Sequence, residues 1–176
     1  MLTKKGIVNR LCRADGQLAI TPLLDADEQL NAAGIDLRLG PDLVVSRRAT
    51  GAVAYDPADV DQVGERIRDY QEYVRRPFGS AIYLHPGDFA LARTLEQLRL
   101  PADLAGDVAG RSSWGRLGLV IATATLIEPE FSGTVTLELA NLGNIPMVLY
   151  VGMRVAQLSL FPASDGRHDE SGEQEE

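Results

Sequence analysis

Hydrophobic residues along most of the chain recur with the two-residue period of β-strands. Residues 35–39 alternate apolar and charged side chains before Gly40-Pro41, which predicts a strand followed by a turn. Further short apolar runs are bounded by Gly, Pro, Asn or Asp, and they span residues 42–46, 81–84, 89–95, 104–109, 118–124, 133–139, 147–150 and 154–161. Strands at this spacing are typical of sandwiches and barrels. We therefore expect an all-β fold.

Three segments depart from this pattern. Apolar residues at near-helical spacing in residues 6–15 predict a short N-terminal helix with Cys12 packed on its apolar side. Residues 47–71 are polar and irregular, which predicts a long excursion or lid. Residues 162–176 have almost no apolar content and end in an acidic run, so we expect a disordered tail after one domain spanning residues 1–161.

Composition narrows the classes of function. A formal net charge of -8 argues against nucleic-acid binding through a general basic surface, so a polyanionic ligand would need a local basic pocket. Neither a signal peptide nor a membrane span is readable. A single cysteine excludes an intrachain disulfide and a multi-cysteine zinc site, and it favours a reducing compartment. We expect a cytoplasmic protein without nucleic-acid or membrane partners.

The densest cluster of anion-binding chemistry is the segment 110–116. It contains Arg111, Ser112, Ser113, Gly115 and Arg116. Two guanidinium groups and two hydroxyls supply donors, and the glycine lets the backbone approach an anion closely. The segment suits a triphosphate, but a surface turn whose arginines pair with acidic residues is an equal alternative. Trp114, within it, could stack on a base, although packing is the commoner role of such an aromatic.

Glu138 is the candidate catalytic carboxylate. Strand alternation would place Thr136 and Glu138 on one side of the strand, and Leu137 and Leu139 on the other. A carboxylate desolvated beside a ligand can act as a general base and acid. The alternative is an ordinary solvent-facing strand position.

Several segments in one order resemble the successive motifs of dCTP deaminases, in the dUTPase-like superfamily. The resemblance covers about residues 6–161. Its motifs are residues 33–40 (AGIDLRLG), 84–89 (LHPGDF), 110–119 (GRSSWGRLGL), 127–133 (IEPEFSG), 136–138 (TLE) and 149–157 (LYVGMRVAQ).

The resemblance implies a distorted jelly roll, or dUTPase-like β-barrel, that forms a homotrimer with pyrimidine-nucleotide sites between subunits. It assigns residues 111–116 to the substrate and phosphate loop, Ser112 to the reacting base, and Glu138 to catalysis. Glu128 corresponds to a sugar-binding aspartate, and Gln157 to a triphosphate-contacting glutamine; the expected substrate-binding set also includes Thr136 and Leu137. The implied reaction converts dCTP to dUTP and ammonia without zinc, with Mg²⁺ entering on the triphosphate.

The sequence also departs from the family pattern. Residues 119–125 are one residue shorter than expected, with Ile121 where a histidine is usual, and a shift near 1 Å in a base-lining loop can cost about a hundredfold in rate. Glu128 is one methylene longer than the usual aspartate. Glu130 replaces a frequent glycine and would be strained at positive φ. Residues 165–176 lack the usual Tyr and Lys of a closing segment.

Three functions remain in view. The first is deamination of dCTP or a related cytosine nucleotide. The second is dUTPase-like pyrophosphate release, in which water attacks phosphorus instead of carbon. The third is a catalytically diverged paralogue that binds a nucleotide without turnover.

Overall fold

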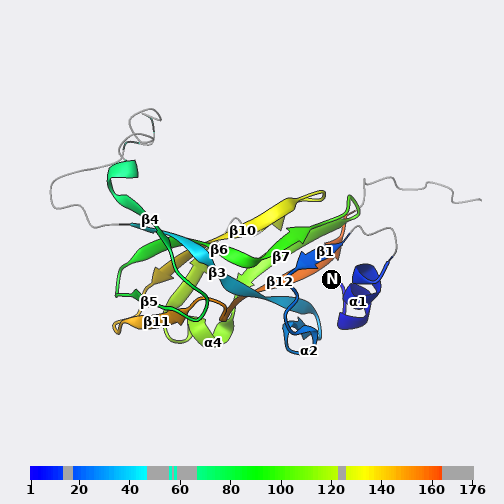
Figure 1. Ribbon diagram of the computed structural model, residues 1–176. Coiled ribbons are helices and arrows are strands. Elements are labelled where there is room, and N and C mark those ends of the chain that lie inside the picture. Colours follow the sequence, from blue (N-terminus) through cyan, green and yellow to red (C-terminus); the bar gives the residue numbers. More distant parts are fainter. Residues whose placement is uncertain (14–17, 47–55, 57, 59–66, 123–125, 164–176) are drawn as a thin grey trace, which may run out of the picture.

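The computed structural model describes residues 1–13, 18–46, 56, 58, 67–122 and 126–163, and these are dominated by strands (Figure 1). The helices are α1 (Lys4–Leu11), α2 (Ala26–Gln29) and α4 (Ser112–Gly115). The strands are β1 (Ala19–Thr21), β2 (Leu30–Asn31), β3 (Gly34–Ser46), β4 (Gln71–Arg75), β5 (Ala81–Leu84), β6 (Phe89–Arg99), β7 (Leu104–Gly110), β8 (Leu119–Ala122), β9 (Leu126–Ile127), β10 (Ser132–Asn141), β11 (Met147–Tyr150) and β12 (Arg154–Pro162).

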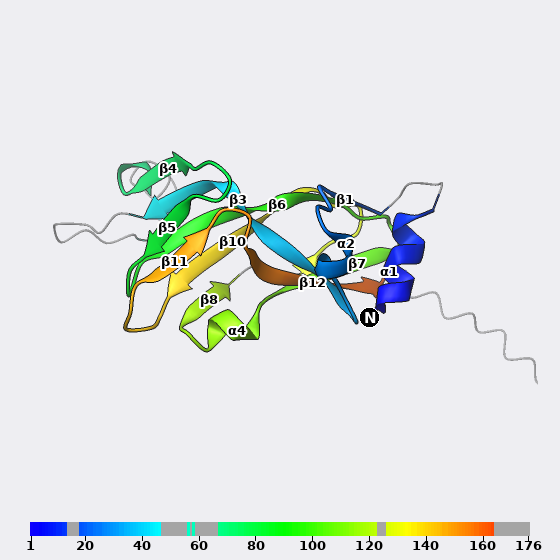
Figure 2. The ribbon, with the colours of Figure 1, turned by 60° about the horizontal axis from the view of Figure 1, so that its bottom comes forward.

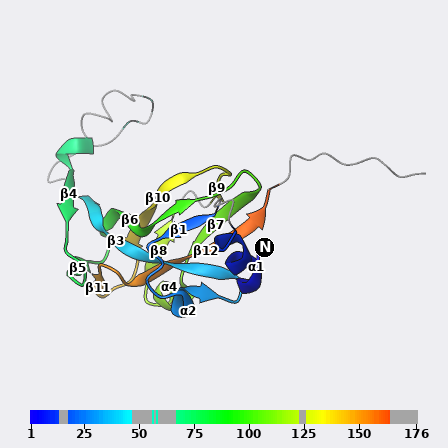
Figure 3. The same ribbon diagram turned by 45° about the vertical axis from the view of Figure 1, so that its right-hand side comes forward.

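The strands form one large curled sheet and one small sheet. Within the described residues the large sheet has ten strands, in the order β8-β10-β6-β3-β12-β7-β9, with β1, β2 and β4 added at its sides. β5 and β11 pair separately, and the described pairings are all antiparallel. The large sheet curls into a half-barrel, seen from the side in Figure 3. The all-β, jelly-roll-like fold expected from the sequence is therefore confirmed.

The core fills the inside of this curl. β6 alternates buried and more exposed residues along its whole length, as the two-residue period predicts. Buried leucines of four neighbouring strands meet there, among them Leu37, Leu98, Leu137 and Leu158, each fully covered. Burying a leucine stabilises the fold by about 2 kcal/mol, so this inner layer fixes the strand register.

The turn predicted at Gly40-Pro41 is wrong, because β3 runs through it as one strand. β3 crosses the molecule from β4 to the α2 end (Figure 2). Its first part pairs with β12 and its last part with β4, and its register against β6 shifts between Leu39 and Leu43. Pro41, which has no N–H, lies where the strand changes partners, and its carbonyl accepts from Arg76 N at 2.9 Å. Glycine and proline here bend a strand instead of ending it.

The N-terminal helix is shorter than predicted. Thr3 caps α1 by accepting a hydrogen bond from Gly6 N at 3.4 Å, and Ile7 is fully buried. The helix ends at Leu11, so Cys12 lies in the terminal turn and is exposed, and its predicted packing is wrong.

Parts of the predicted excursion and tail lie outside the described residues. This applies to most of residues 47–71 and to residues 164–176. β12 continues through Pro162, and Ala163 N donates to Asp103 O at 2.9 Å. Among the described helices, none has the length and apolar character needed to cross a membrane.

Candidate functional site

Glu138 lies in the middle of β10, where the strand pairs with β6 on one side and β8 on the other. Its register partners are Leu91 and Ala122. Glu138 is half-buried and Thr136 exposed, whereas Leu137 between them is fully buried. The predicted alternation is therefore confirmed, and Leu137 can offer only its backbone to a ligand on the outer side.

Glu138 lines a pocket of about 380 Å³. Glu128, just after β9, adds a second carboxylate, and Thr134 and Thr136 line the same pocket. Its apolar wall is formed by Leu126, Ile127, Phe131 and Val135. Two carboxylates would repel a phosphate but can accept hydrogen bonds from amino or hydroxyl groups. The pocket therefore suits the base and sugar of a nucleotide better than its phosphates.

The arginine-rich segment forms a short turn after β7. Arg111 is the N-cap of α4, and Ser112, Ser113, Gly115 and Arg116 are exposed. A Cβ added to Gly115 would meet no atom within 4 Å, so packing within the chain does not require glycine there. The segment offers hydroxyl and guanidinium donors to solvent.

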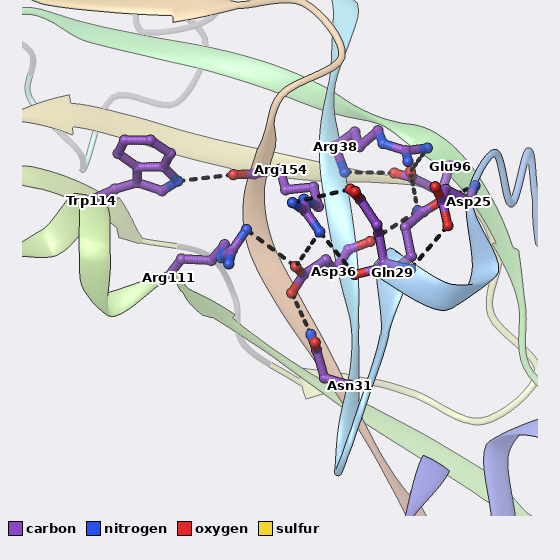
Figure 4. A network of polar contacts seen from close by, with 10 residues as sticks. Asp25, Gln29, Asn31, Asp36, Arg38, Glu96, Arg111, Trp114 and Arg154 are labelled. Carbon is purple, nitrogen blue, oxygen red and sulfur yellow. Dashed lines mark hydrogen bonds and ion pairs between the residues drawn. The ribbon is translucent and has the colours of Figure 1, made fainter. Parts of the chain in front are cut away.

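Trp114 is the exception in this segment because its side chain faces inward. The indole Nε1–H donates to Arg154 O at 2.9 Å, and the ring packs against the hydrophobic core (Figure 4). This arrangement uses the indole donor within the chain and fixes α4 to β12.

Asp36, on β3, forms ion pairs with two arginines (Figure 4). Arg111 is the N-cap of α4, and Arg154 is the first residue of β12. Asp36 Oδ2 lies 3.2 Å from Arg111 Nη1 and 3.8 Å from Arg154 Nη1. Its Oδ1 accepts a hydrogen bond from Asn31 Nδ2 at 2.8 Å. Gln157 is the register partner of Asp36 on β12 and is half-buried. Two predicted phosphate-binding residues are thus neighbours of one buried carboxylate, Arg111 through an ion pair and Gln157 through the strand register.

The sequence-predicted residues fall into two groups. Glu128, Thr136 and Glu138 share the pocket, whereas neither Gln157 nor any residue of the segment 111–116 lines it. The binding roles of both groups remain predictions. Arg154 was not singled out from the sequence, although it belongs to the motif 149–157 and is a charged residue at the start of an apolar strand.

The loop between β9 and β10 carries one of the departures noted in the sequence. Glu130 has a φ of 64°, a left-handed conformation that costs a residue with a Cβ roughly 1–2 kcal/mol. The positive φ at which strain was expected is therefore present. Residues 123–125, in the segment expected to line the base, lie outside the described residues, and Ile121 before them pairs with Leu139.

Comparisons with known proteins agree with this architecture. The family model described as dCTP deaminase-like matches residues 1–163. A dCTP deaminase of Halorubrum lacusprofundi is 45% identical over 159 residues, covering 90% of this chain and 75% of the relative. A "dCTP deaminase, dUMP-forming" of Halobacterium salinarum is also 45% identical over 159 residues, covering 90% of this chain and 78% of the relative.

Among solved structures, the 2'-deoxycytidine 5'-triphosphate deaminase of Agrobacterium tumefaciens matches with a TM-score of 0.65 and 25% identity. The match covers 90% of this chain and 46% of that one, so the chain spans about half the length of the Agrobacterium protein. The family model and both relatives cover nearly all of the described sheet. The chain therefore belongs to the dCTP deaminase-like family.

Proposed function

We propose that this protein deaminates dCTP by hydrolysis. The observation that carries the proposal is the position of Glu138, a half-buried carboxylate in a pocket that also holds Glu128 and Thr136. The names of the two relatives support the substrate.

Glu138 acts as general base and then as general acid. It accepts a proton from the water that attacks C4 of cytosine, and it delivers that proton to the departing nitrogen as the C4–N bond breaks. The balanced reaction is dCTP plus water giving dUTP plus ammonia. Ser112 orients the base, and the Glu128 carboxylate accepts a hydrogen bond from the sugar hydroxyl.

The phosphate chain binds outside the pocket, beside the segment 111–116. Arg111 and Arg116 supply guanidinium donors, and Gln157 supplies its amide, as the family resemblance implies. No three His, Cys, Asp or Glu side chains gather among the described residues, so this part of the chain offers no all-protein metal cage. Mg²⁺ would enter with the nucleotide, as the family resemblance implies, and phosphate oxygens would hold it.

The two groups of residues combine across a subunit interface in a homotrimer. Support comes from the apolar patch formed by Leu117, Leu142 and Ile145, which are 60%, 72% and 75% exposed beside α4. Leu142 N donates to Gly118 O at 2.9 Å, so the two loops that carry the patch are adjacent. An exposed apolar patch of this kind marks a contact surface.

A second candidate reaction couples deamination to release of pyrophosphate. Its specific support is the Halobacterium salinarum relative, which is named as dUMP-forming and is as similar as the relative named only as a dCTP deaminase. The balanced reaction is then dCTP plus two waters giving dUMP, pyrophosphate and ammonia. One experiment can test for deamination and identify the product.

Incubation of the purified full chain with dCTP, CTP or dUTP and Mg²⁺ tests both candidates, with ammonia and pyrophosphate measured in the same samples. Ammonia alone from dCTP indicates dUTP formation, and equimolar ammonia and pyrophosphate indicate dUMP formation. Pyrophosphate from dUTP without ammonia from dCTP would identify a dUTPase-like enzyme. Nucleotide binding without either product would identify a diverged paralogue.

The variant Glu138→Gln separates catalysis from binding. It removes the proton acceptor while keeping the side-chain shape, so we expect a loss of turnover of at least about a hundredfold with dCTP binding retained. Glu130→Gln is the matched control, because Glu130 is an exposed glutamate of the same region that does not line this pocket. Unchanged turnover in Glu138→Gln would remove Glu138 from the mechanism.

A further inference from the structure

Asp36 is a buried carboxylate whose two oxygens have different partners. Only 3% of its side chain is exposed. Oδ1 accepts a hydrogen bond from Asn31 Nδ2, whereas Oδ2 is in ion-pair contact with Arg111 and Arg154 and accepts no hydrogen bond from the described residues. A buried carboxylate is costly unless it is paired, so this arrangement depends on the two arginines.

The two arginines differ in how firmly other groups hold them. Arg154 donates from Nη1 to Glu28 O at 2.9 Å, and its Nη2 lies 3.3 Å from Glu28 Oε2. Arg111 has Asp36 as its ion-pair partner among the described residues, and 32% of its side chain is exposed. A guanidinium carries five N–H donors, so a contact at one edge leaves others directed toward solvent.

Asp36 is itself fixed by the packing of its hairpin. It lies two residues after Gly34, where an added Cβ would lie 2.8 Å from Leu158 O and 3.0 Å from the Gln157 side chain. Asn31, on the neighbouring strand β2, orients the carboxylate through its other oxygen. The carboxylate therefore presents Oδ2 to Arg111 from a position that β2, β3 and β12 define together.

We propose that Asp36 is a positioning residue that holds the Arg111 guanidinium in place for the phosphate chain of the nucleotide. The inference rests on the proposed function, because it takes Arg111 as a phosphate ligand. A guanidinium fixed before the ligand arrives loses less side-chain entropy on binding. Asp36 itself does not touch the nucleotide and acts through Arg111.

This role makes a prediction opposite to that of simple charge neutralisation. Removing a negative charge from a phosphate site would strengthen binding if Asp36 only reduced the positive potential. If Asp36 positions Arg111, Asp36→Asn weakens dCTP binding by about tenfold or more, because a charge-assisted contact that orders the guanidinium is lost. Deoxycytidine, which has no phosphate, should bind Asp36→Asn and the parent equally.

Titrations of dCTP with Mg²⁺, and of deoxycytidine, test this in the Glu138→Gln background, where the substrate is not consumed. Asp42→Asn is the matched control, since Asp42 lies on the same strand and pairs with Arg75, outside the proposed site. Arg111→Ala and the double variant Asp36→Asn/Arg111→Ala complete a cycle. The double variant should bind dCTP no more weakly than Arg111→Ala alone.

Three results would overturn the inference: dCTP binding in Asp36→Asn that equals or exceeds the parent, equal losses for dCTP and deoxycytidine, or additive losses in the cycle. If Asp36→Asn does not fold, Asn31→Ala replaces it, because it frees Oδ1 and keeps the charge. That variant should show a smaller loss specific to dCTP, and no loss would overturn the inference. The titrations do not depend on turnover, so absence of ammonia from the wild-type protein contradicts the proposed function alone.

Discussion

Glu96 lies inside β6 with its side chain fully buried. Its Oε1 accepts from Gln29 Nε2 at 2.9 Å and its Oε2 from Arg38 N at 2.8 Å, while Arg38 Nη1 is 3.9 Å from Oε1. Burial raises the pKa of Glu96, and the hydrogen bonds and the Arg38 charge only partly oppose this. The ionised form is therefore less favourable in the folded chain than in the unfolded chain.

Glu96→Gln should lower the free energy of unfolding by an amount that depends on pH. The amide can accept only one of the two hydrogen bonds and leaves a buried donor unsatisfied, at a cost of about 1–3 kcal/mol. Because the folded pKa lies above the ordinary 4.5, the stability that Glu96 contributes is fully present below pH 4.5 and is lost as pH rises through the folded value. Urea unfolding at several pH values should show the deficit of Glu96→Gln shrinking as pH rises.

Asp103→Asn is the control of opposite sign. Arg10 Nη2 lies 2.7 Å from Asp103 Oδ2 and lowers the pKa of Asp103 below its ordinary 3.8. The contribution of Asp103 is thus present above pH 3.8 and is lost as pH falls through the folded value. Asp103 is half-exposed, so the effect should stay below about 1 kcal/mol. A deficit of Glu96→Gln that grows with pH would mean that the Arg38 charge outweighs burial.

Single residues also show where sequence reasoning succeeds. Strain at Glu130 was expected if its φ is positive, because the family often has glycine at this position, and the φ of 64° meets that condition. The exposure of Cys12 was not expected, because it depends on the residue at which α1 ends. Propensity and spacing define such an end only to within a few residues.

At the scale of elements, the strands between Ala81 and Pro162 follow the apolar alternation closely. β5 and β11 have the predicted bounds, and β6, β7 and β10 extend them by a few residues. β3 differs because Gly40-Pro41 has the composition of a turn, yet Leu39 and Leu43 on either side are both buried in the core. Pairing of β3 with β6 and β12 keeps the strand continuous despite its turn-like composition at this point. The local pattern of apolar and polar residues does not indicate those partner strands.

Gly40→Ala tests whether the bend in β3 requires a glycine. An added Cβ would lie 2.6 Å from Arg93 O and 2.9 Å from Thr94 O, and backbone atoms of β6 cannot move aside easily. We expect a loss of about 1–3 kcal/mol in urea unfolding. Gly6→Ala in α1 is the control, because its Cβ would meet neighbours at 3.6 Å and should raise stability by up to about 1 kcal/mol. Equal effects of the two substitutions would contradict a specific constraint at Gly40.

At the scale of the whole molecule, the sequence predicted the two halves of the proposed site, the segment 111–116 and the pocket of Glu138, but not how they are connected. Motif order indicated the segment 111–116 and Glu138, whereas the ion pair between Asp36 and Arg111 depends on how β3 and β7 flank β12. Contacts between residues far apart in the sequence follow from topology, which periodicity alone does not define.

The separation of the two halves leads to a test of the proposed homotrimer. Arg116→Ala removes a proposed phosphate ligand and Glu138→Gln removes the proposed general base, so we expect each variant alone to release little ammonia. If each proposed site combines the segment 111–116 of one subunit with the Glu138 pocket of another, a mixed trimer contains some sites that carry neither substitution. When the two variants are present in equal amounts and associate at random, each half of a site is unsubstituted in about half of the cases. About a quarter of wild-type activity should therefore be restored.

The measurement is ammonia release from dCTP by the two co-expressed variants, with the mass of the assembly determined by light scattering. Co-expression of Arg116→Ala with Arg111→Ala is the control, because both substitutions affect the same half and no site is restored. Mixed trimers of Arg116→Ala and Glu138→Gln that stay inactive would place both halves of each site in one chain. In that case the apolar patch of Leu117, Leu142 and Ile145 would join subunits without completing the site. Recovery of activity for Arg116→Ala with Glu138→Gln, but not for Arg116→Ala with Arg111→Ala, requires a site shared between neighbouring subunits.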